Sequence, residues 1–301
     1  MAISKRHHYL PEFFIKGFTN DAGLIWVYDK IEDRILDKPL SPKSIFYQWN
    51  RNTLEVGGHQ SDIIEQAYSY VDNRTAKYLY ECRTEMDLDK VETMEHFGYI
   101  ILFMIFNFWR VPQNDNQNEL LMKFYSETKL DWESLLKLNA LDISSIEKTK
   151  IAKTFIPIEI MREATKFNTG GKIQFKIIDF KSPVFLLSDN PVLLPKIPVD
   201  ITDFSTSLIF PISRERIICF LEEPKYNLGI EFIKTADLLL MHQANRYIGF
   251  HSKEGLDNFV SGYRHFRKIG DHADIVKRDF FQSIKLSARS ATNNLVQQDN
   301  G

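Results

Sequence analysis

The stretch "FNTGGKIQFKIIDF", residues 167–180, marks the point where the chain changes from a helical to a strand-like pattern. Before it, apolar residues recur at spacings of three and four, which is typical of helices with one buried face. Gly170 and Gly171 suit the end of a helix, and the residues that follow are rich in β-branched and aromatic side chains. The sequence therefore predicts a block of helices followed by a group of strands.

The helical block extends over about 61–168. The spacing of apolar residues predicts helices at 61–82, 88–110, 117–127, 131–138 and 144–168. Pro112 would end the most apolar of them. Its core, "FGYIILFMIF" at 97–106, is about half of the roughly 20 residues needed to cross a bilayer, so it predicts a buried helix.

Strand patterns lie on both sides of this block. Residues 24–38 alternate around a charged turn, as in a hairpin with one buried face. Further strands are expected at 172–180, 183–191, 206–213, 216–223 and 248–252, and helices at 231–247 and 255–266. The order predicts an α+β fold in which a mainly antiparallel sheet, built from the N- and C-terminal thirds, packs against the central helical block. We expect one domain over 1–301, with a polar tail at about 291–301.

Composition restricts the classes of partner. The chain has 301 residues, a net charge of -2 and a sequence pI of about 6.5, so it has no strong overall positive field for nucleic acid or an anionic membrane. A local basic groove is compatible with these values. Cys82 and Cys219 lie in no zinc or disulfide pattern, and the first residues contain no apolar leader. We therefore expect a cytoplasmic protein with no membrane segment.

The first candidate site is the stretch "KRHHYLPEFFIKGF", residues 5–18. His7 and His8 would point to opposite sides of an extended segment, so one could face a cleft while the other faces the core or solvent. Histidine is the most frequent acid, base and metal ligand near neutral pH. The alternative is a basic surface patch on a mobile N-terminus.

The second candidate is "FLLSDNPVLLP", residues 185–195, where an apolar strand ends at Ser188, Asp189 and Asn190. Functional polar groups often lie at strand ends, because the strand fixes the backbone while the turn exposes the side chains. Asp189 could orient a histidine, bind a metal or act as a base. Alternatively, these residues cap local amides in an ordinary turn.

The third candidate is Arg110, which follows Trp109 at the end of the most apolar helix. A guanidinium in this position either pairs with a buried carboxylate or clamps a phosphate or carboxylate ligand. Asn245 ends a later helix in a similar way, with His242 near the same face. The usual phosphate-loop, dinucleotide, nucleophile-elbow and zinc-protease motifs are absent from the sequence.

A family resemblance connects these candidates. "HHYLPEFFIKGF" followed by "GLIWVYDK", Ser-Asp-Asn-Pro at 188–191, Arg110, the segment 210–213 and the helix with Asn245 together resemble the domain-of-unknown-function 4238 family. The resemblance implies no established activity. It does imply that His7, His8, Asp189 and Arg110 belong to one site, and we expect Tyr9, Ser188, Asn190 and Asn245 to contribute to ligand binding.

Our first hypothesis is an enzyme. If the N-terminal segment lies beside the strand that ends at Asp189, one histidine would meet this carboxylate and become a base with a raised pKa. Arg110 would hold an anionic group, which suits hydrolysis or transfer at a phosphodiester or nucleotide, and a divalent metal could assist. The substrate would be a nucleotide or small RNA rather than duplex DNA. A defence or toxin-like effector role would fit.

Two other hypotheses use the same residues. In one, they form a non-catalytic module that binds a ligand or a protein. In the other, they are structural and tie the N-terminal segment to the sheet. An accessible imidazole at a shared pocket would favour the enzyme. A pocket without an accessible base would favour the binding module. Full burial of these residues with satisfied partners would favour the structural role. The sequence carries no signal for the oligomeric state.

Overall fold

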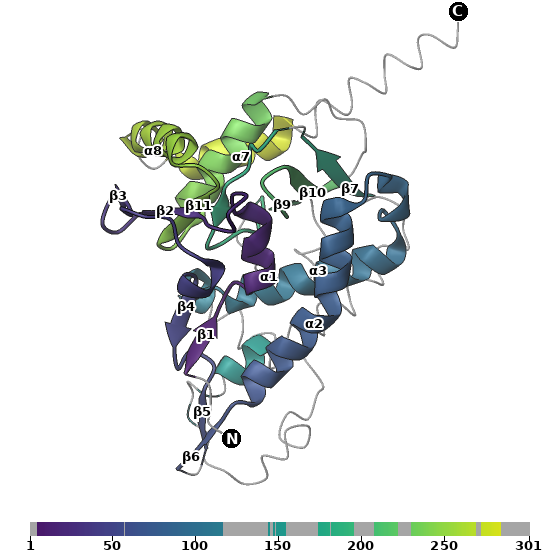
Figure 1. The fold of residues 1–301 in the computed structure, drawn as a ribbon, viewed down its shortest axis with the longest axis vertical. Helices are drawn as coiled ribbons and strands as arrows, with labels where there is room; N and C mark the ends of the chain where they lie inside the picture. Colours follow the sequence, from purple (N-terminus) through teal and green to yellow (C-terminus); the bar gives the residue numbers. More distant parts are fainter. Residues whose placement is uncertain are drawn as a thin grey trace, which may run out of the picture.

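The computed structural model of the protein describes residues 5–56, 58–116, 144, 147, 149–154, 174–180, 182–195, 208–221, 230–268 and 272–283. Helices α2 and α3 lie on one side of the molecule, and α7 and α8 lie on the other with the strands of the main sheet (Figure 1). The short helix α1 lies between these two parts (Figure 1). The described residues thus show the α+β architecture that the sequence predicts.

The main sheet combines strands from both ends of the chain. Its order is β3-β2-β11-β8, and every neighbouring pair is antiparallel. The strands are β2 (Trp26–Asp29), β3 (Arg34–Ile35), β8 (Leu187–Ser188) and β11 (Tyr247–Phe250). Val27 pairs with Gly249, which pairs with Leu187 on its other side. This confirms the predicted sheet of N- and C-terminal strands.

The remaining strands form smaller antiparallel units. One sheet has the order β7-β10-β9, and two ribbons pair β1 with β4 and β5 with β6. Their bounds are β7 (Gln174–Asp179), β9 (Leu208–Pro211), β10 (Arg216–Leu221), β1 (Arg6–His8), β4 (Tyr47–Trp49), β5 (Leu54–Val56) and β6 (His59–Ser61). The sequence predicts an irregular connection at about 40–60. This segment instead contains β4, β5 and the start of β6; β4 forms because it pairs with distant β1, which local pattern does not reveal.

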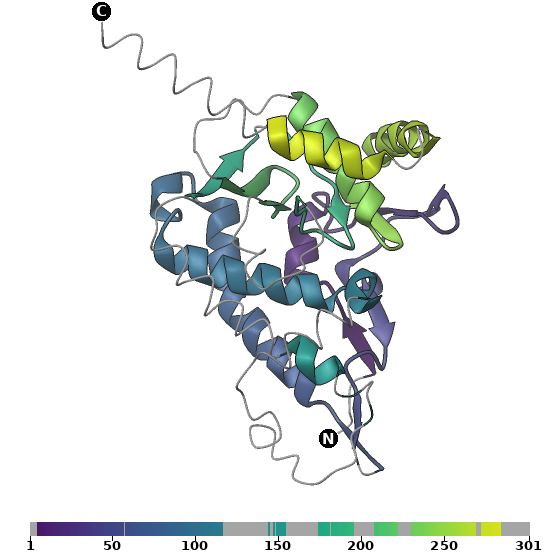
Figure 2. The same cartoon turned by 180° about the vertical axis from the view of Figure 1, so that it is seen from behind.

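The helices follow the predicted segments. They are α1 (Glu12–Ile15), α2 (Ile63–Thr84), α3 (Met94–Arg110), α7 (Ile230–Gln243) and α8 (Lys253–Lys268), with a further helix at 273–283 packed along α7 (Figure 2). Within the described ranges, none of the helices has both the length and the apolar character required to traverse a membrane. The predicted helices at 117–127 and 131–138, much of 144–168 and the tail at 291–301 lie outside the described residues.

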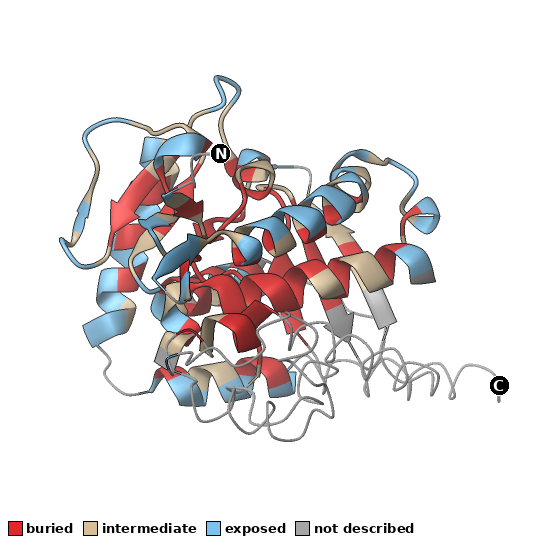
Figure 3. Cartoon of the chain, turned by 90° about the horizontal axis from the view of Figure 1, so that it is seen from below, coloured by how far each residue is buried: buried red, intermediate tan, exposed pale blue. Residues whose placement is uncertain are grey.

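The core is built from all parts of the chain. Buried residues gather in the interior, and the outer faces of the helices are exposed (Figure 3). Phe14 of α1 stacks on Phe210 of β9 at 5.4 Å between ring centroids, and Phe103 of α3 lies 5.4 Å from Phe14. Full burial of such rings contributes about 1.5–3 kcal/mol each. The N-terminal segment is therefore packed into the core.

A buried arginine fixes the same segment. The Arg83 guanidinium, at the end of α2, donates hydrogen bonds to the carbonyl oxygens of Phe13 (2.7 Å), Phe14 (2.8 Å) and Ile212. Burial lowers the pKa of Arg83 to about 9. Gly17 lies directly over the guanidinium, and a Cβ atom there would approach Cζ to 2.6 Å. Only glycine therefore allows this contact.

Candidate functional site

The two adjacent histidines point to opposite faces of the β1-β4 ribbon. In the register of this ribbon, Arg6 lies opposite Trp49, His7 opposite Gln48, and His8 opposite Tyr47. Since side chains alternate along a strand, Arg6, His8, Tyr47 and Trp49 share one face. This alternation is the one that the sequence predicts for His7 and His8.

His7 is fully buried, and its Nδ1 atom accepts a hydrogen bond of 2.9 Å from the backbone N–H of Asn52. His8 is half-buried, and its Nε2 atom is buried with no hydrogen-bond partner. Burial lowers the pKa of His8, and Arg6 and Arg110 act in the same direction while Glu12 opposes them. His8 is therefore a neutral imidazole at pH 7.

Arg110 contacts a carboxylate within the protein. Its Nη1 atom donates hydrogen bonds of 3.0 and 2.9 Å to the two carboxylate oxygens of Asp72 on α2. The guanidinium lies 4.5 Å from the ring centroid of Tyr68, and only 4% of Arg110 is exposed. Burial raises the pKa of Asp72, and Arg110 opposes this shift. Of the two alternatives for Arg110, the structure shows the buried ion pair.

Asp189 is also fully buried, and its hydrogen bonds come from the backbone. The N–H groups of Asn245 (2.7 Å), Arg246 (2.8 Å) and Tyr247 (2.9 Å) donate to its carboxylate. Burial raises the pKa of Asp189 to about 6, and these three amides oppose the shift. Asp189 thus caps the turn between α7 and β11, and amides occupy the positions that we expected a histidine to take.

The neighbouring candidates also bind backbone atoms. The Ser188 hydroxyl donates to the carbonyl of Leu240 (3.0 Å), and the Asn190 side chain donates to the carbonyl of Gln243 (3.4 Å). Asn245 contributes its backbone N–H, as described above, and its side chain is exposed. These residues connect the end of β8 to the end of α7.

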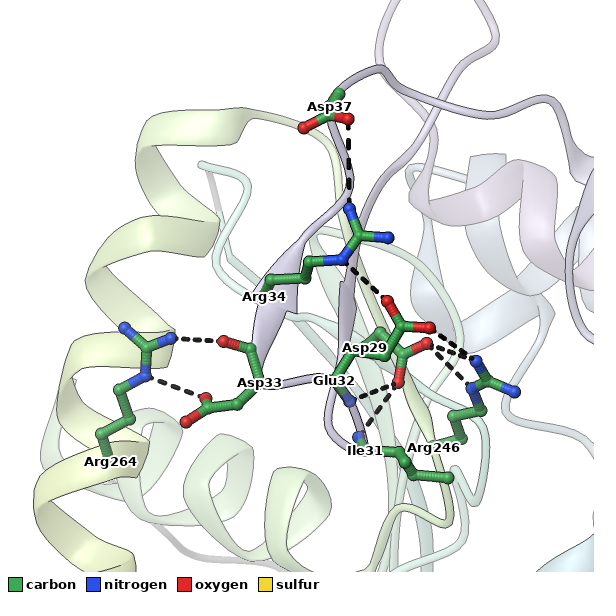
Figure 4. Close-up of polar contacts among 8 residues, drawn as sticks. All are labelled: Asp29, Ile31, Glu32, Asp33, Arg34, Asp37, Arg246 and Arg264. Carbon is green, nitrogen blue, oxygen red and sulfur yellow. Dashed lines mark hydrogen bonds and ion pairs between the residues drawn. The ribbon is translucent and has the colours of Figure 1, made fainter.

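Ion pairs extend this network to the β2-β3 turn. Arg246 donates to Asp29 through Nε (2.9 Å), and its Nη2 atom lies 2.7 Å from the same oxygen (Figure 4). Lys30 donates to the carbonyls of His242 (2.9 Å) and Ala244 (2.6 Å) at the end of α7. Burial lowers the pKa of Lys30 to about 8, and Asp189 opposes this shift. A cation here suits the negative end of the helix dipole.

The predicted site residues therefore separate into two groups. Arg110 lies close enough to His8 to lower the pKa of this histidine. Asp189, in contrast, contacts the turn at 245–247. Tyr9 lies between the groups: its backbone N–H donates to Phe46 (2.9 Å), and its pKa is raised by burial and then by Asp189. The N-terminal segment does reach the strand end, but through Tyr9.

A cavity of about 230 Å³ adjoins the group that contains His7 and Arg110. Its lining comes from the segment after β4, from α2, from the end of α3 and from residues 149–153: Arg51, Asn52, Ile64, Tyr68, Trp109, Asp115, Thr149, Lys150 and Lys153. Arg51 Nε donates to the carbonyl of Arg110 (3.0 Å). Asn52 contacts His7, and Tyr68 contacts Arg110, so the cavity is contiguous with both.

Cations surround one carboxylate in this cavity. Arg51 binds Asp115 in a bidentate manner, at 2.9 Å from Nη1 and 2.8 Å from Nη2, and Lys153 also contacts Asp115. Burial lowers the pKa of Lys153, and Asp115 opposes this shift. Lys150 donates to the carbonyl of Thr53 (2.7 Å) and to Glu147 (3.2 Å). Three positive side chains thus converge on the cavity.

Several buried polar atoms in this region lack a hydrogen-bond partner. They are His8 Nε2, Thr53 Oγ1, Asn107 Oδ1 and Arg110 Nε. Such atoms are uncommon in native proteins and indicate a bound water, ion or ligand, or a functional role. At the strand end, Asp189 and Ser188 have hydrogen-bond partners, and Asn190 Oδ1 is a single buried atom without one. The end of α3 and the β1-β4 ribbon are therefore the better candidate site.

A second cavity, of about 540 Å³, lies between β3 and α8. The charged residues that line it include Asp33, Arg34 and Arg264. Arg264 donates to the carboxylate of Asp33 (3.0 Å) and to its carbonyl oxygen (2.7 Å), as Figure 4 shows. Arg34 pairs with Glu32 (2.7 Å). None of the site residues predicted from the sequence lines this cavity.

Sequence reasoning missed Arg51, Lys150 and Lys153. A signal for Arg51 exists, because the segment 38–54 contains three cations and aromatic residues but no carboxylate. Lys150 and Lys153 have no such signal, because tertiary packing brings their helical segment to the cavity. In the part of the chain that the structure describes, no group of three or more His, Cys, Asp or Glu side chains could hold a metal ion.

The fold and the site define an α+β protein with a cation-lined cavity next to a histidine-bearing ribbon. A family model described as a protein of unknown function (DUF4238) matches residues 6–254. The chain belongs to this family, as its motifs suggest. No curated protein and no solved structure matches it.

Proposed function

We propose that this protein binds a phosphate-bearing ligand of the nucleotide class in the cavity lined by Arg51, Lys150 and Lys153. The observation that carries the proposal is the convergence of these three cations on one small cavity. The planar fork of an arginine matches the oxygens of carboxylate and phosphate alike, and Arg51 already holds a carboxylate in this way. Asp115 would then be the internal counter-ion that a phosphate displaces or joins.

The cavity offers binding rather than acid–base chemistry. Tyr68 and Trp109 line the cavity but are 3% and 0% exposed, so a nucleoside would lie outside the cavity while its phosphate binds the cations. His7 is fully buried next to it, so the cavity has no accessible imidazole from this residue. These features favour the binding module over the enzyme.

Calorimetric titration with ATP, GMP and inorganic phosphate tests the proposal. We expect at least one nucleotide to bind, and K153Q to weaken it about tenfold, because a charge-assisted hydrogen bond contributes about 1.5–3 kcal/mol. K253Q is the matched control, since Lys253 forms an exposed pair with Asp257 (2.9 Å) on α8. The proposal fails if no nucleotide binds, or if both variants bind as the wild type does.

A catalytic function is the second candidate, and His8 supports it. Its neutral imidazole is half-buried and lies near Arg110, which suits a base for hydrolysis or transfer at a phosphodiester once Nε2, buried here without a partner, is exposed to a substrate. Incubating H8Q and the wild-type protein with a short RNA tests this candidate. We expect cleavage by the wild type and at least a hundredfold slower cleavage by H8Q. A defence role and a cytoplasmic location stay predictions.

A further inference from the structure

One face of the β1-β4 ribbon is unusual for a soluble protein. It carries Arg6 and His8 on one strand and, directly opposite, Trp49 and Tyr47 on the other. Trp49 is 64% exposed, which makes it one of the most exposed large apolar side chains in the described residues. The two aromatic rings meet edge to face at 6.1 Å, and the Arg6 guanidinium lies 3.8 Å from the Tyr47 ring centroid.

The segments that form this face are rich in cations. The two segments that form the ribbon and its connections, 5–11 and 38–54, contain five cations and no carboxylate: Lys5, Arg6, Lys38, Lys43 and Arg51. The chain as a whole has a net charge of -2, so this concentration is local. The carboxylate of Glu12 lies near His8 and raises the pKa of this histidine, whereas Arg6 and Arg110 lower it.

The ribbon also leads directly to the cavity. Arg51 follows Trp49 by two residues through a turn, in which Asn50 has a φ of 57°. The Nη1 atom of Arg51 donates to the Gln48 side chain on β4 (2.9 Å) and to Asp115 (2.9 Å), and its Nη2 atom also donates to Asp115 (2.8 Å). The cavity volume of about 230 Å³ is smaller than that of a typical small-molecule site, roughly 300–1,000 Å³. A ligand that places one phosphate there would extend onto the surface.

We propose that the face formed by Arg6, His8, Tyr47 and Trp49 is a stacking platform for the bases of a single-stranded nucleic acid. This inference rests on the proposed function, because a strand that passes from this face round the end of the ribbon, to the side of Gln48, would place a phosphate at Arg51 and Lys153. Aromatic side chains stack on bases of any sequence, and neighbouring cations follow the phosphates. The His8 ring lies beside Tyr47 on the same face, at 5.7 Å between ring centroids.

Fluorescence anisotropy with labelled single-stranded U10 RNA, T10 DNA and a ten-base-pair RNA duplex tests the platform. Base stacking contributes about 1–3 kcal/mol per base, so W49A should lower the affinity for a single strand about tenfold, while W49F should retain most of it. Y80A is the matched control, since Tyr80 is 66% exposed on α2. Comparing U10 with T10 shows whether RNA or DNA is preferred.

The outcomes separate this inference from the proposed function. If ATP or GMP binds in a Lys153-dependent way but U10 and T10 do not bind, or bind equally to W49A, the platform is overturned and the cavity proposal stands. If W49A weakens U10 or T10 but nucleotides do not bind and K153Q has no effect, the platform stands and the cavity proposal fails. Tighter binding of the duplex than of either single strand overturns the platform.

Discussion

The strand end at Asp189 and the ribbon at His8 differ in how their polar groups are satisfied. At the strand end, Asp189 accepts three backbone hydrogen bonds, and Ser188 donates to a helix carbonyl. At the ribbon and the nearby end of α3, His8, Thr53 and Arg110 each have a buried polar atom without a partner. Satisfied polar groups hold a fold together, whereas unsatisfied ones indicate a site for something else. Asp189 therefore has a structural role, although Asn190 Oδ1 beside it is also buried without a partner, and the ribbon is the region to which we assign the proposed function.

Removing the cap at the strand end should have the largest effect. Asp189→Ala leaves three backbone N–H groups without their acceptor and should lower the free energy of unfolding by about 4 kcal/mol. Urea denaturation measures this loss. Asn245→Ala is the control, because Asn245 donates through its backbone and its side chain is exposed. A stable Asp189→Ala variant that loses nucleotide binding would reverse the comparison.

Breaking the buried ion pair should have the next largest effect. Arg110→Met leaves the buried carboxylate of Asp72 without its partner and should cost about 3 kcal/mol. The double variant Arg110→Met, Asp72→Leu should recover much of this loss, because it removes both charges. Thermal denaturation of both variants measures the recovery. If the double variant is as unstable as the single one, Arg110 stabilises the protein through contacts other than its ion pair with Asp72.

A smaller effect, of opposite sign, is expected at the functional region. Thr53→Val replaces a buried hydroxyl that has no hydrogen-bond partner with a methyl group of similar size. We expect the ligand-free protein to gain about 1 kcal/mol of stability. Denaturation without ligand checks the gain, and a repeat with saturating ATP shows whether bound ligand reduces it. A loss of stability in Thr53→Val would mean that the hydroxyl is satisfied in solution.

Asp237 tests whether an unpartnered atom alone identifies a site. It is fully buried on α7; its Oδ1 atom accepts from Leu186 N–H at 3.4 Å, and its Oδ2 atom has no partner. Burial raises the pKa of Asp237 well above its usual value. The folded protein therefore keeps the proton of the Asp237 carboxyl group, whereas the unfolded chain releases it above about pH 4. The stability that this protonated group contributes is lost as the pH rises.

Asp237→Asn should therefore differ little from the wild type at pH 4 and become progressively more stable than it above that pH. Urea denaturation between pH 4 and pH 8 measures the difference. A constant difference across this range would show that Asp237 is ionised in the folded protein. In that case, protonation of the carboxyl group would not explain why the Oδ2 atom of Asp237 has no hydrogen-bond partner.

The sequence predicts this structure best where local pattern determines it. The spacing of apolar residues locates α2 and α3, and alternation locates the β2-β3 hairpin. Alternation also predicts that His7 and His8 lie on opposite faces. The turn chemistry of Ser188 to Pro191, considered as an alternative to a site, describes what Asp189 does.

Contacts between distant segments could not be predicted in this way. The pairing of β1 with β4 depends on a register that two three-residue strands do not encode alone. The sequence does not determine the partners of Arg110 and Asp189. Burial and tertiary neighbours determine whether a charged group binds a ligand or another part of the protein. The cavity combines residues 51–52, 64–68, 109–115 and 149–153, which only the fold brings together.

The pairing of β2 with β11 has a consequence for biosynthesis. A ribosome releases Trp26–Asp29 well before the strand that pairs with it, Tyr247–Phe250, which lies about 220 residues later in the chain. Until then the hairpin edge is open, and such an edge is prone to join other chains. Because closing so long a loop is slow, the nascent polypeptide should benefit from chaperones until both strands have been synthesised.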